Sequence, residues 1–473
     1  MVFIGWVLPL HGDTAAPPDD ADPDRPPTLT LIEEVDAIHD EWLEDAKKNP
    51  DIRVWRGLRA DRAQQSVQII AEATGLATDH PAEFLLISTR SGHDYEALAI
   101  SYARPSELHE ALEFIGIPAG APFNPRDLRF FPKGERVLVT VRWTDREENS
   151  HAWPAEALVR DSRTNASIPE DGFVFVGSHW LEEDGERRYA ADTYDPHSLI
   201  SLYNEPTTVL DVPRPVSQGD VYGFLRPYPG RQPEQGQRLE ILFEPEFKDG
   251  RSRIADITLD IRAGAEDAPI HLTLYDDDGE ALHDGVALRN VFGALNRLIR
   301  AERTPFLHLR IGDEVPLKEI RDLVRLLVAF EEEEDLHFEP PAPGDLFYRA
   351  FIPAEAHRDP ANRPSQALEL RLERDGPDLA GRVVNIRDIR ARREDEFEAE
   401  VTEYDVSTPA QLPSMLAEIQ HHLPVLLVFA PADLTYGTLM EWLRPVRDTH
   451  PTVHIFQNTV EKKSNSSFVS LNR

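Results

Sequence analysis

The sequence predicts an α+β protein, with a mainly β N-terminal domain followed by two tandem small α/β sheets that carry helices on one face. Short apolar strands separated by turn residues succeed one another from Ile52 to Pro215. After Arg253, strands alternate with amphipathic helices, and the same apolar pattern occurs twice. The length of 473 residues, with 41% hydrophobic and 29% charged residues, indicates several folded domains, because a single compact core does not grow this large.

Composition excludes several classes of function. The formal net charge of −35 argues against nucleic acid and against anionic membrane surfaces, because both need a basic face on the protein. The absence of cysteine excludes thiol chemistry, disulfides and cysteine metal sites. No apolar run approaches the ~20 residues that span a bilayer, so we expect no transmembrane segment. No Walker loop, Rossmann glycine fingerprint or H-E-x-x-H helix occurs, and we expect no cofactor.

Residues 1–27 are interpreted as a signal-like remnant and a Pro-rich linker. Val2–Leu10 is apolar, Thr14–Ala16 supplies small residues, and Pro17–Pro27 is rich in Pro and Asp. The basic region that opens a secretory signal is missing, and a frayed N-terminal strand is the alternative. The first interpretation predicts a periplasmic or cell-envelope location, and the second predicts a cytoplasmic one.

Residues 28–50 are predicted to form an amphipathic helix. Leu31, Val35, Ile38 and Trp42 recur at three- and four-residue spacing, which places them on one face. Thr30 and Glu33 have the spacing of a capping box, with Thr30 as the N-cap. We expect this helix to pack as an arm on the next domain or on a partner.

Residues 51–247 are predicted to form the mainly β domain. One helix interrupts its strands: it begins at Pro105–Ser106 and ends at Gly116, with an apolar stripe between them. The segments predicted as strands are Val67–Ala73, Glu83–Ser88, Arg136–Trp143, Phe173–Gly177 and Leu239–Phe243.

Residues 252–345 and 346–458 are predicted to be two copies of one unit, followed by a polar tail at 459–473. The alternating strand that begins at Ile257 recurs 111 residues later at Leu368. A second strand and the helix after it recur 119 residues later, so that Leu309 matches Val428 and Ile320 matches Leu439. Growth from 111 to 119 indicates a net insertion in the second copy, which we place in the charged hairpin region Val383–Val406. Pro445 is expected to kink or shorten the second helix of that copy.

His93 and Glu96 form the most suggestive pair of polar residues. Both can ligate a metal or exchange protons, and they follow a strand, where sites are often built. Ser178 and Asp192 come from other elements and can converge on the pair to make a ligand-binding site, for which the sequence names no metal. A hydrogen-bonded turn, in which His93 caps backbone groups, is the structural alternative.

The N-terminal β region resembles the YdjY-type domain of bacterial envelope and lipoprotein-like proteins. The residues that carry the resemblance are Ser91–Leu98, Pro105–Leu112, Val137–Trp143, Ala155–Asp161, Phe175–Ser178, Ala191–Asp192 and Val209–Pro213. That family has no assigned reaction, so the resemblance implies a fold unit without naming its chemistry.

Each C-terminal copy resembles the periplasmic domain of ExbD/TolR biopolymer-transport proteins. The clearest segments are Phe306–Ile320 and Val425–Leu439. The resemblance implies a small sheet with two helices on one face, self-association and a place in the cell envelope. The transmembrane helix with its proton-carrying Asp, which drives those complexes, is absent from this sequence.

These features favour a non-enzymatic binding or scaffold protein of the cell envelope, which docks a protein partner through its ExbD/TolR-like modules. A metal-dependent hydrolase using His93 and Glu96 is the alternative, and it predicts that these side chains meet Asp192 or His197 around one point. A structural component of a large assembly is a third reading.

Overall fold

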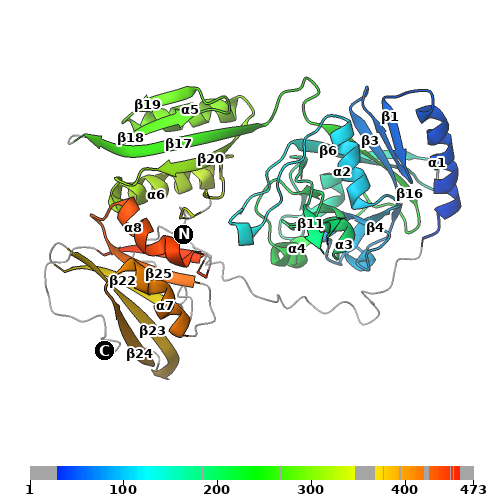
Figure 1. The fold of residues 1–473 in the computed structure, drawn as a ribbon. Helices are drawn as coiled ribbons and strands as arrows, with labels where there is room; N and C mark the ends of the chain where they lie inside the picture. Colours follow the sequence, from blue (N-terminus) through cyan, green and yellow to red (C-terminus); the bar gives the residue numbers. More distant parts are fainter. Residues whose placement is uncertain are drawn as a thin grey trace. The chain divides into compact units, whose positions relative to one another are not determined.

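The computed structural model describes residues 29–183, 185–265, 268–342, 344–346, 368–375, 378–393, 396–419, 425–447, 449–450 and 452–458. The expected signal-like segment, the Pro-rich linker and the polar tail lie outside these residues. The chain divides between Ile254 and Ala255 into two compact units (Figure 1), which we call the barrel unit and the C-terminal unit. None of the helices in the described ranges combines the length and apolarity that crossing a membrane requires.

The predicted mixture of helices and strands is confirmed, and strands predominate in the described residues. In the barrel unit, eight of the described strands close into a barrel in the order β3-β16-β6-β10-β14-β13-β4-β5, and β5 pairs back with β3. Closure leaves these strands without a free edge, and apolar residues such as Val67, Ile69 and Phe243 fill the core. The barrel strands are β3 (Ser66–Ala73), β4 (Phe84–Ser88), β5 (Ala97–Ser101), β6 (Arg136–Thr144), β10 (Phe173–Phe175), β13 (Ser198–Ser201), β14 (Leu210–Asp211) and β16 (Arg238–Pro245).

Smaller elements surround the barrel. The β1–β2 hairpin extends β3, β7 pairs with β6, and α2 contributes its apolar stripe to the core. The helices are α2 (Pro105–Phe114), α3 (Ala190–Thr193) and α4 (Gln218–Phe224), with 3-10 turns η1 (Asp94–Glu96), η2 (Pro125–Asp127) and η3 (Ala155–Leu158). The strands are β1 (Ile52–Trp55), β2 (Leu58–Asp61), β7 (Ser150–Pro154), β8 (Val159–Asp161), β9 (Ala166–Ser167), β11 (Trp180–Glu183), β12 (Glu186–Tyr189) and β15 (Leu225–Pro227).

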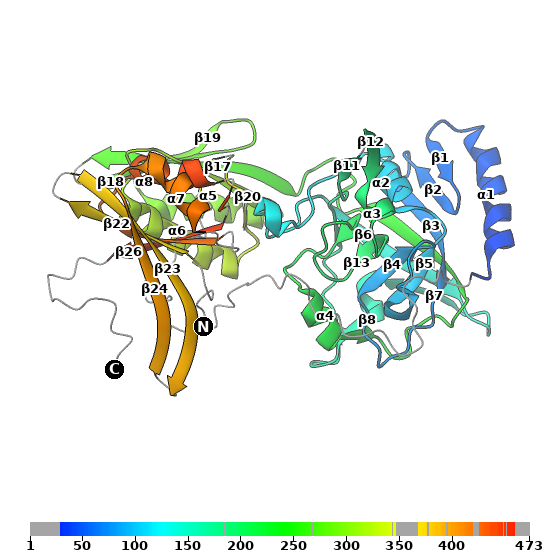
Figure 2. The same cartoon turned by 60° about the horizontal axis from the view of Figure 1, so that its bottom comes forward.

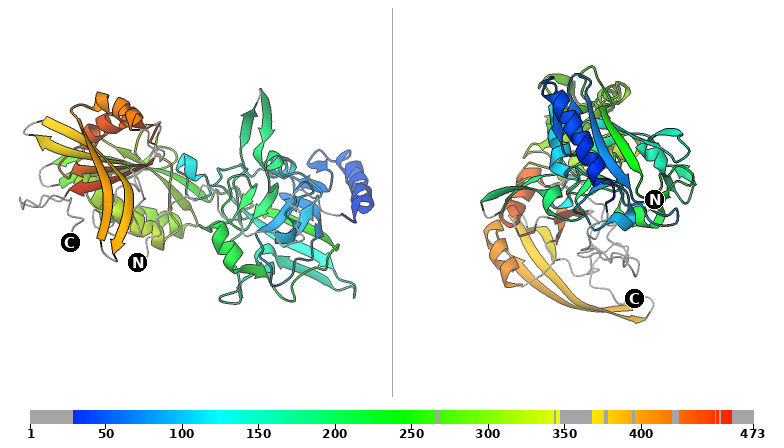
Figure 3. Two further views of the ribbon diagram at one scale, coloured as in Figure 1. Left: turned by 90° about the horizontal axis from the view of Figure 1, so that it is seen from below. Right: turned by 90° about the vertical axis from the view of Figure 1, so that its right-hand side faces the viewer.

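The predicted arm helix is present as α1 (Ile32–Ala46), which packs Val35 and Trp42 against Ile70 and Tyr102 of the barrel unit (Figure 3). The expected Thr30–Glu33 capping box is wrong. Instead, the carboxylate of Glu72 accepts hydrogen bonds from the Thr30 backbone N–H at 3.0 Å and from its hydroxyl at 2.8 Å. A buried carboxylate of strand β3 therefore accepts the Thr30 N–H, which in a capping box is bonded by the residue at the position of Glu33.

The C-terminal unit contains two sheets of identical strand order. In the described residues each sheet has five strands, arranged as β19-β18-β17-β20-β21 and as β24-β23-β22-β25-β26. The first copy consists of β17 (Ile254–Ala265), β18 (Ala268–Tyr275), β19 (Ala281–Gly285), α5 (Leu288–Arg300), β20 (Thr304–Ile311), α6 (Leu317–Glu333) and β21 (His337–Phe338). The second consists of β22 (Leu368–Asp375), β23 (Asp378–Arg393), β24 (Glu396–Val406), η7 (Pro409–Gln411), α7 (Leu412–Glu418), β25 (Val425–Pro431), α8 (Tyr436–Leu443), η8 (Arg444–Val446) and β26 (Thr452–Asn458). Leu309 and Val428 occupy the corresponding strands β20 and β25, as their spacing predicts.

Both helices of each copy pack on one face of their sheet. On β17, Ile257, Leu259 and Ile261 are buried while the residues between them are polar, so only one face of this strand is apolar. The apolar residues of α5 and α6 belong to the same core as that face. This core continues through the second copy, so both sheets share one hydrophobic interior.

The copies differ where the sequence indicates an insertion. Strand β23 has 16 residues where β18 has 8, and β24 has 11 where β19 has 5. Figure 2 shows the long hairpin that β23 and β24 form. The helix that precedes Pro445 is also shorter, with 8 residues in α8 against 17 in α6. It ends at Leu443, and Pro445 lies in the 3-10 turn η8 that follows, because proline cannot donate the hydrogen bond that would continue the helix.

The loops that precede α6 and α8 join the two copies around a pseudo-twofold axis. Pro316 pairs with Thr435 in an antiparallel bridge, and the two residues lie 119 positions apart. The Leu317 N–H donates to the Leu434 carbonyl and the Tyr436 N–H donates to the Val315 carbonyl, both at 2.8 Å. Exchanging each residue for its counterpart 119 positions away turns one hydrogen bond into the other: Leu317 becomes Tyr436 and Leu434 becomes Val315. The self-complementary interface of a twofold dimer has this property.

A second pair of hydrogen bonds obeys the same rule. The Lys318 N–H donates to the Ala432 carbonyl at 3.2 Å, and the Gly437 N–H donates to the Asp313 carbonyl at 2.8 Å. Gly437 is required by this close approach, because a Cβ there would lie 2.6 Å from the Cβ of Asp313. The C-terminal unit is therefore built as a twofold dimer within one chain.

Candidate functional site

The candidate site lies where β4 and β5 run side by side. These strands are parallel, and the short crossover 89–96 joins the end of β4 to the start of β5. The Glu83 N–H donates to the Glu96 carbonyl at 2.9 Å, and the Leu202 N–H, after β13, donates to the Glu83 carbonyl at 2.9 Å. Backbone pairing thus brings three segments that are distant in sequence to one place.

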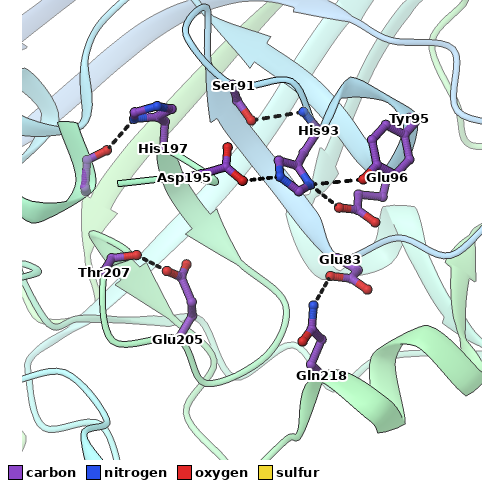
Figure 4. Close-up of polar contacts among 11 residues, drawn as sticks. Glu83, Ser91, His93, Tyr95, Glu96, Asp195, His197, Glu205, Thr207 and Gln218 are labelled. Carbon is purple, nitrogen blue, oxygen red and sulfur yellow. Dashed lines mark hydrogen bonds and ion pairs between the residues drawn. The ribbon is translucent and has the colours of Figure 1, made fainter. Parts of the chain in front are cut away.

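His93 stands between two carboxylates (Figure 4). Its Nδ1 contacts the carboxylate of Glu96, and its Nε2 contacts the carboxylate of Asp195. The hydroxyl of the fully buried Ser91 accepts the His93 N–H at 3.2 Å, and the Phe84 ring packs edge-on with its centroid 6.0 Å from that of the imidazole. The turn that carries His93 is therefore held at its backbone and at both ring nitrogens.

The environment of His93 favours its charged form. Burial lowers its pKa, but the hydrogen bonds to Asp195 and Glu96 outweigh burial and raise the pKa to about 10. A histidine that is protonated at neutral pH has no free lone pair, so it can neither accept a proton nor ligate a metal in this arrangement. The three side chains therefore form an ion triad in this arrangement.

Glu83 adds a second carboxylate next to Glu96. Burial, followed by the charge of Glu96, raises the pKa of Glu83 to about 7. Its Oε2 accepts a hydrogen bond at 2.9 Å from the side-chain amide of Gln218, at the start of α4. Glu83 is 2% exposed, so water scarcely reaches its carboxyl group, and this loss of hydration is the main cause of the raised pKa.

Glu205, from the connection between β13 and β14, supplies a fourth carboxylate after those of Glu96, Asp195 and Glu83. Burial raises its pKa to about 7, and the charge of Asp195 acts in the same direction. The Thr207 hydroxyl donates to Oε1, whereas Oε2 finds no hydrogen-bond partner among the described residues. In Figure 4 the carboxylate of Glu205 points toward Asp195 and the His93 triad.

The neighbouring Asp211 is fully buried, and its Oδ2, like Oε2 of Glu205, has no hydrogen-bond partner among the described residues. Its Oδ1 accepts from the Asn204 amide at 3.1 Å and from the Val212 N–H at 2.7 Å. Burial nonetheless holds the pKa of Asp211 well above its usual value. The site is thus a group of acids, all buried except Asp195, with one histidine cation, and we call Glu83, His93, Glu96, Asp195 and Glu205 the acid cluster.

Asp192 and His197 point to other partners. The Asp192 carboxylate accepts the Ser106 N–H at 3.0 Å and the Ser106 hydroxyl at 2.5 Å, which caps the first turn of α2. The Nδ1 of His197 lies 3.2 Å from the Ala191 carbonyl. Within the described ranges neither side chain makes a hydrogen bond or ion pair with His93 or Glu96, so the convergence that a hydrolase would require is not observed.

Ser178 belongs to a different part of the barrel unit. It is buried beside Tyr189, whose hydroxyl donates to the Gly177 carbonyl at 2.8 Å. His109 of α2 packs against Tyr189 with ring centroids 5.3 Å apart. These contacts join α2 to the strand that precedes Ser178 and do not include the acid cluster.

The sequence identified His93 and Glu96 but missed Glu83, Asp195 and Glu205. No spacing rule connects these residues, because they lie on separate elements up to 122 positions apart. The only local signal is a glutamate next to a strand that is otherwise buried along its whole length, as Glu83 is before β4. No group of three or more side chains suited to hold a metal ion occurs among the described residues.

Comparison with known proteins gives one result for the barrel unit. Residues 58–210 match the sequence profile of the YdjY domain. No curated protein matches the chain. The match includes β2 through β14 and therefore seven of the eight barrel strands, with β16 outside it. A YdjY domain is thus found at residues 58–210, within the barrel unit.

Proposed function

We propose that this protein is a non-enzymatic binding or scaffold protein whose C-terminal unit docks partners in pairs. The observation that carries the proposal is the Pro316–Thr435 bridge with its two pairs of symmetry-related hydrogen bonds. An isologous contact presents every surface feature twice. Duplication within one chain fixes that arrangement at any protein concentration, which suits a scaffold that must hold two equivalent ligands.

The likeness of the two copies to ExbD/TolR periplasmic domains is part of this proposal. In its support, each copy places two helices on one face of a five-stranded sheet in the described residues, as the resemblance implies. A location in the periplasm or cell envelope follows from the likeness and from the apolar N-terminal segment. Fractionation of cells that carry a C-terminal epitope tag tests the location, and recovery of the protein only from the cytoplasm contradicts it.

Paired docking is tested by site-specific photo-crosslinking at equivalent positions. Asp322 of α6 and Glu441 of α8 lie 119 residues apart on the helical elements of the two copies, and both have partly or fully exposed side chains. A photoreactive residue at either position is expected to capture the same partner protein. A partner captured at one position only, or no captured protein at all, contradicts paired docking.

The matched control places the photoreactive residue at Asp79 of the barrel unit, whose side chain is 86% exposed. Capture at this position of the same protein that Asp322 and Glu441 capture would show nonspecific labelling and remove the support. The alternative function, a hydrolase that uses His93 and Glu96 of the barrel unit, gives no reason for the same protein to be crosslinked at both of these helices.

A further inference from the structure

The crossover 89–96 is fastened to the barrel wall by the acid cluster. His93 connects the crossover to Asp195, and the Glu96 carbonyl accepts from the N–H of Glu83. Glu83 in turn reaches Gln218 of α4. The crossover, the α3–β13 connection and α4 therefore meet around groups that can gain or lose protons.

The acid cluster contains more carboxyl groups than cations. The titratable groups that face one another come from several elements: Glu83 directly before β4, His93, Tyr95 and Glu96 from the crossover, Asp195 from the α3–β13 connection, Tyr203 and Glu205 from the β13–β14 connection, and Asp211 from β14. The triad of His93, Glu96 and Asp195 contributes one cation. Any further carboxylate that ionises must do so with little water and, for Glu205, with one oxygen that has no hydrogen-bond donor.

We propose that the crossover 89–96 is a proton-controlled latch, which lies closed on the barrel while Glu83 and Glu205 carry protons and opens when they ionise. The closed arrangement excludes water from both carboxyl groups, which are 2% and 6% exposed. Ionisation makes that exclusion costly, because a buried carboxylate without a cation is strongly disfavoured. Moving the crossover away hydrates both groups without unfolding the barrel strands.

The linkage between proton binding and opening gives the size of the change in the ratio of open to closed molecules with pH. Each glutamate has a pKa of about 7 in the closed arrangement and 4.5 when hydrated. The closed arrangement therefore binds more protons between these values, and the ratio of open to closed molecules rises with pH. For one such carboxyl group, this ratio increases on the order of tenfold between pH 5.5 and 7.0. His93 acts in the same direction but contributes less in this interval, because it begins to lose its proton in the open arrangement only near pH 6.5.

Hydrogen exchange of backbone amides tests the latch. Peptides that include the crossover are compared at pH 5.5 and 7.0, after correction for the intrinsic pH dependence of exchange. Exchange in the crossover is expected to rise by at least tenfold more than exchange in β6, which is measured in the same sample. Equal changes in the two segments overturn the proposal, and this comparison needs no variant.

Substitutions assign the effect to the two carboxyl groups. Glu83→Gln and Glu205→Gln are each expected to remove on the order of tenfold from the pH-dependent rise. Glu156→Gln is the matched control, because Glu156 is also buried, with a raised pKa, but bonds the Gly172 N–H outside the cluster. A rise that survives both cluster substitutions, or that disappears in the control, rejects a latch operated by Glu83 and Glu205.

Discussion

At the residue scale, His93 joins partners of unequal exposure. The side chain of Glu96 is 10% exposed and that of Asp195 is 59% exposed. Replacement of His93 by Gln removes the cation that neutralises the buried Glu96, whereas Asp195→Asn removes a mostly hydrated charge. We expect His93→Gln to lower the free energy of unfolding by about 2–4 kcal/mol, as for a broken buried pair. Asp195→Asn should cost less than about 1 kcal/mol, as for an exposed pair.

Urea denaturation at pH 7 measures both variants. The contribution of His93 to the free energy of unfolding also depends on pH, because folding raises the pKa of His93 from 6.5 to about 10. The stabilisation is complete below pH 6.5 and disappears as the pH rises through 10. Equal losses in the two variants, or a His93→Gln cost that is larger at pH 10 than at pH 6, would contradict the ion triad.

At the scale of elements, the junction between the two copies depends on Gly437. A Cβ at this position meets the Asp313 Cβ at 2.6 Å, whereas a Cβ on Gly293 of α5 has only the end of the Arg297 side chain nearby, at 3.9 Å. Both glycines lie in helices, where alanine is favoured over glycine by about 1 kcal/mol. We therefore expect Gly437→Ala to lower the melting temperature of the C-terminal unit and Gly293→Ala to leave it unchanged or raise it. Differential scanning calorimetry compares the two, and a stabilised Gly437→Ala protein would refute the close junction.

Elements were predictable from the sequence to the extent that their cause is local. The helix α2 and strands such as β3 and β6 follow from apolar spacing and from turn residues, and the structure confirms them within one or two residues at most ends. Closure of the barrel was not predictable, because the pairing of β5 with β3 depends on twist and on residues that no periodicity connects. The prediction of a capping box for α1 was wrong because the partner of Thr30 is not local: Glu72 lies 42 residues from Thr30.

The repeat was predictable because equivalent residues of the two copies are separated by a constant number of positions in the sequence. Apolar residues separated by 119 positions recur on one face of α6 and on one face of α8 and η8. All eight are buried: Ile320, Leu323, Val324 and Leu327 in the first copy, and Leu439, Trp442, Leu443 and Val446 in the second. The hydrogen bonds between the two copies also join residues related by this offset, but backbone groups make them. Because backbone groups are the same in every residue, the side-chain pattern could not predict these bonds. The acid cluster could not be predicted either, because its members lie in or next to the connections between strands, and the sequence does not specify the path of these connections.

At the scale of the whole molecule, the barrel unit should lose stability as the pH rises. Folding raises the pKa of Glu205 from 4.5 to about 7, so the folded chain binds more protons than the unfolded chain between these values. The free energy of unfolding then falls as the pH rises from 4.5 to 7 and stays reduced above 7. Glu205→Gln removes this term and should stabilise the unit at pH 8 by roughly 1–3 kcal/mol relative to the wild type. Guanidinium unfolding at pH 5.5 and 8.0 checks it, and a variant with the wild-type dependence on pH would show that Glu205 is not the group responsible.

The two halves of the C-terminal unit should depend on each other for folding, whereas the barrel unit should not depend on them. Each copy contributes its sheet face and helices to one shared core. A chain divided between Ile254 and Ala255 is therefore expected to give two cooperatively folded products. Fragments 252–346 and 366–458 expressed alone are expected to lack cooperative unfolding, because each exposes half of the shared core to water. Expressed together, they should form a 1:1 complex with the circular dichroism spectrum of the intact unit. Analytical ultracentrifugation determines the stoichiometry, and either fragment folding alone as a stable monomer would show that the copies are independent domains rather than the halves of a fused dimer.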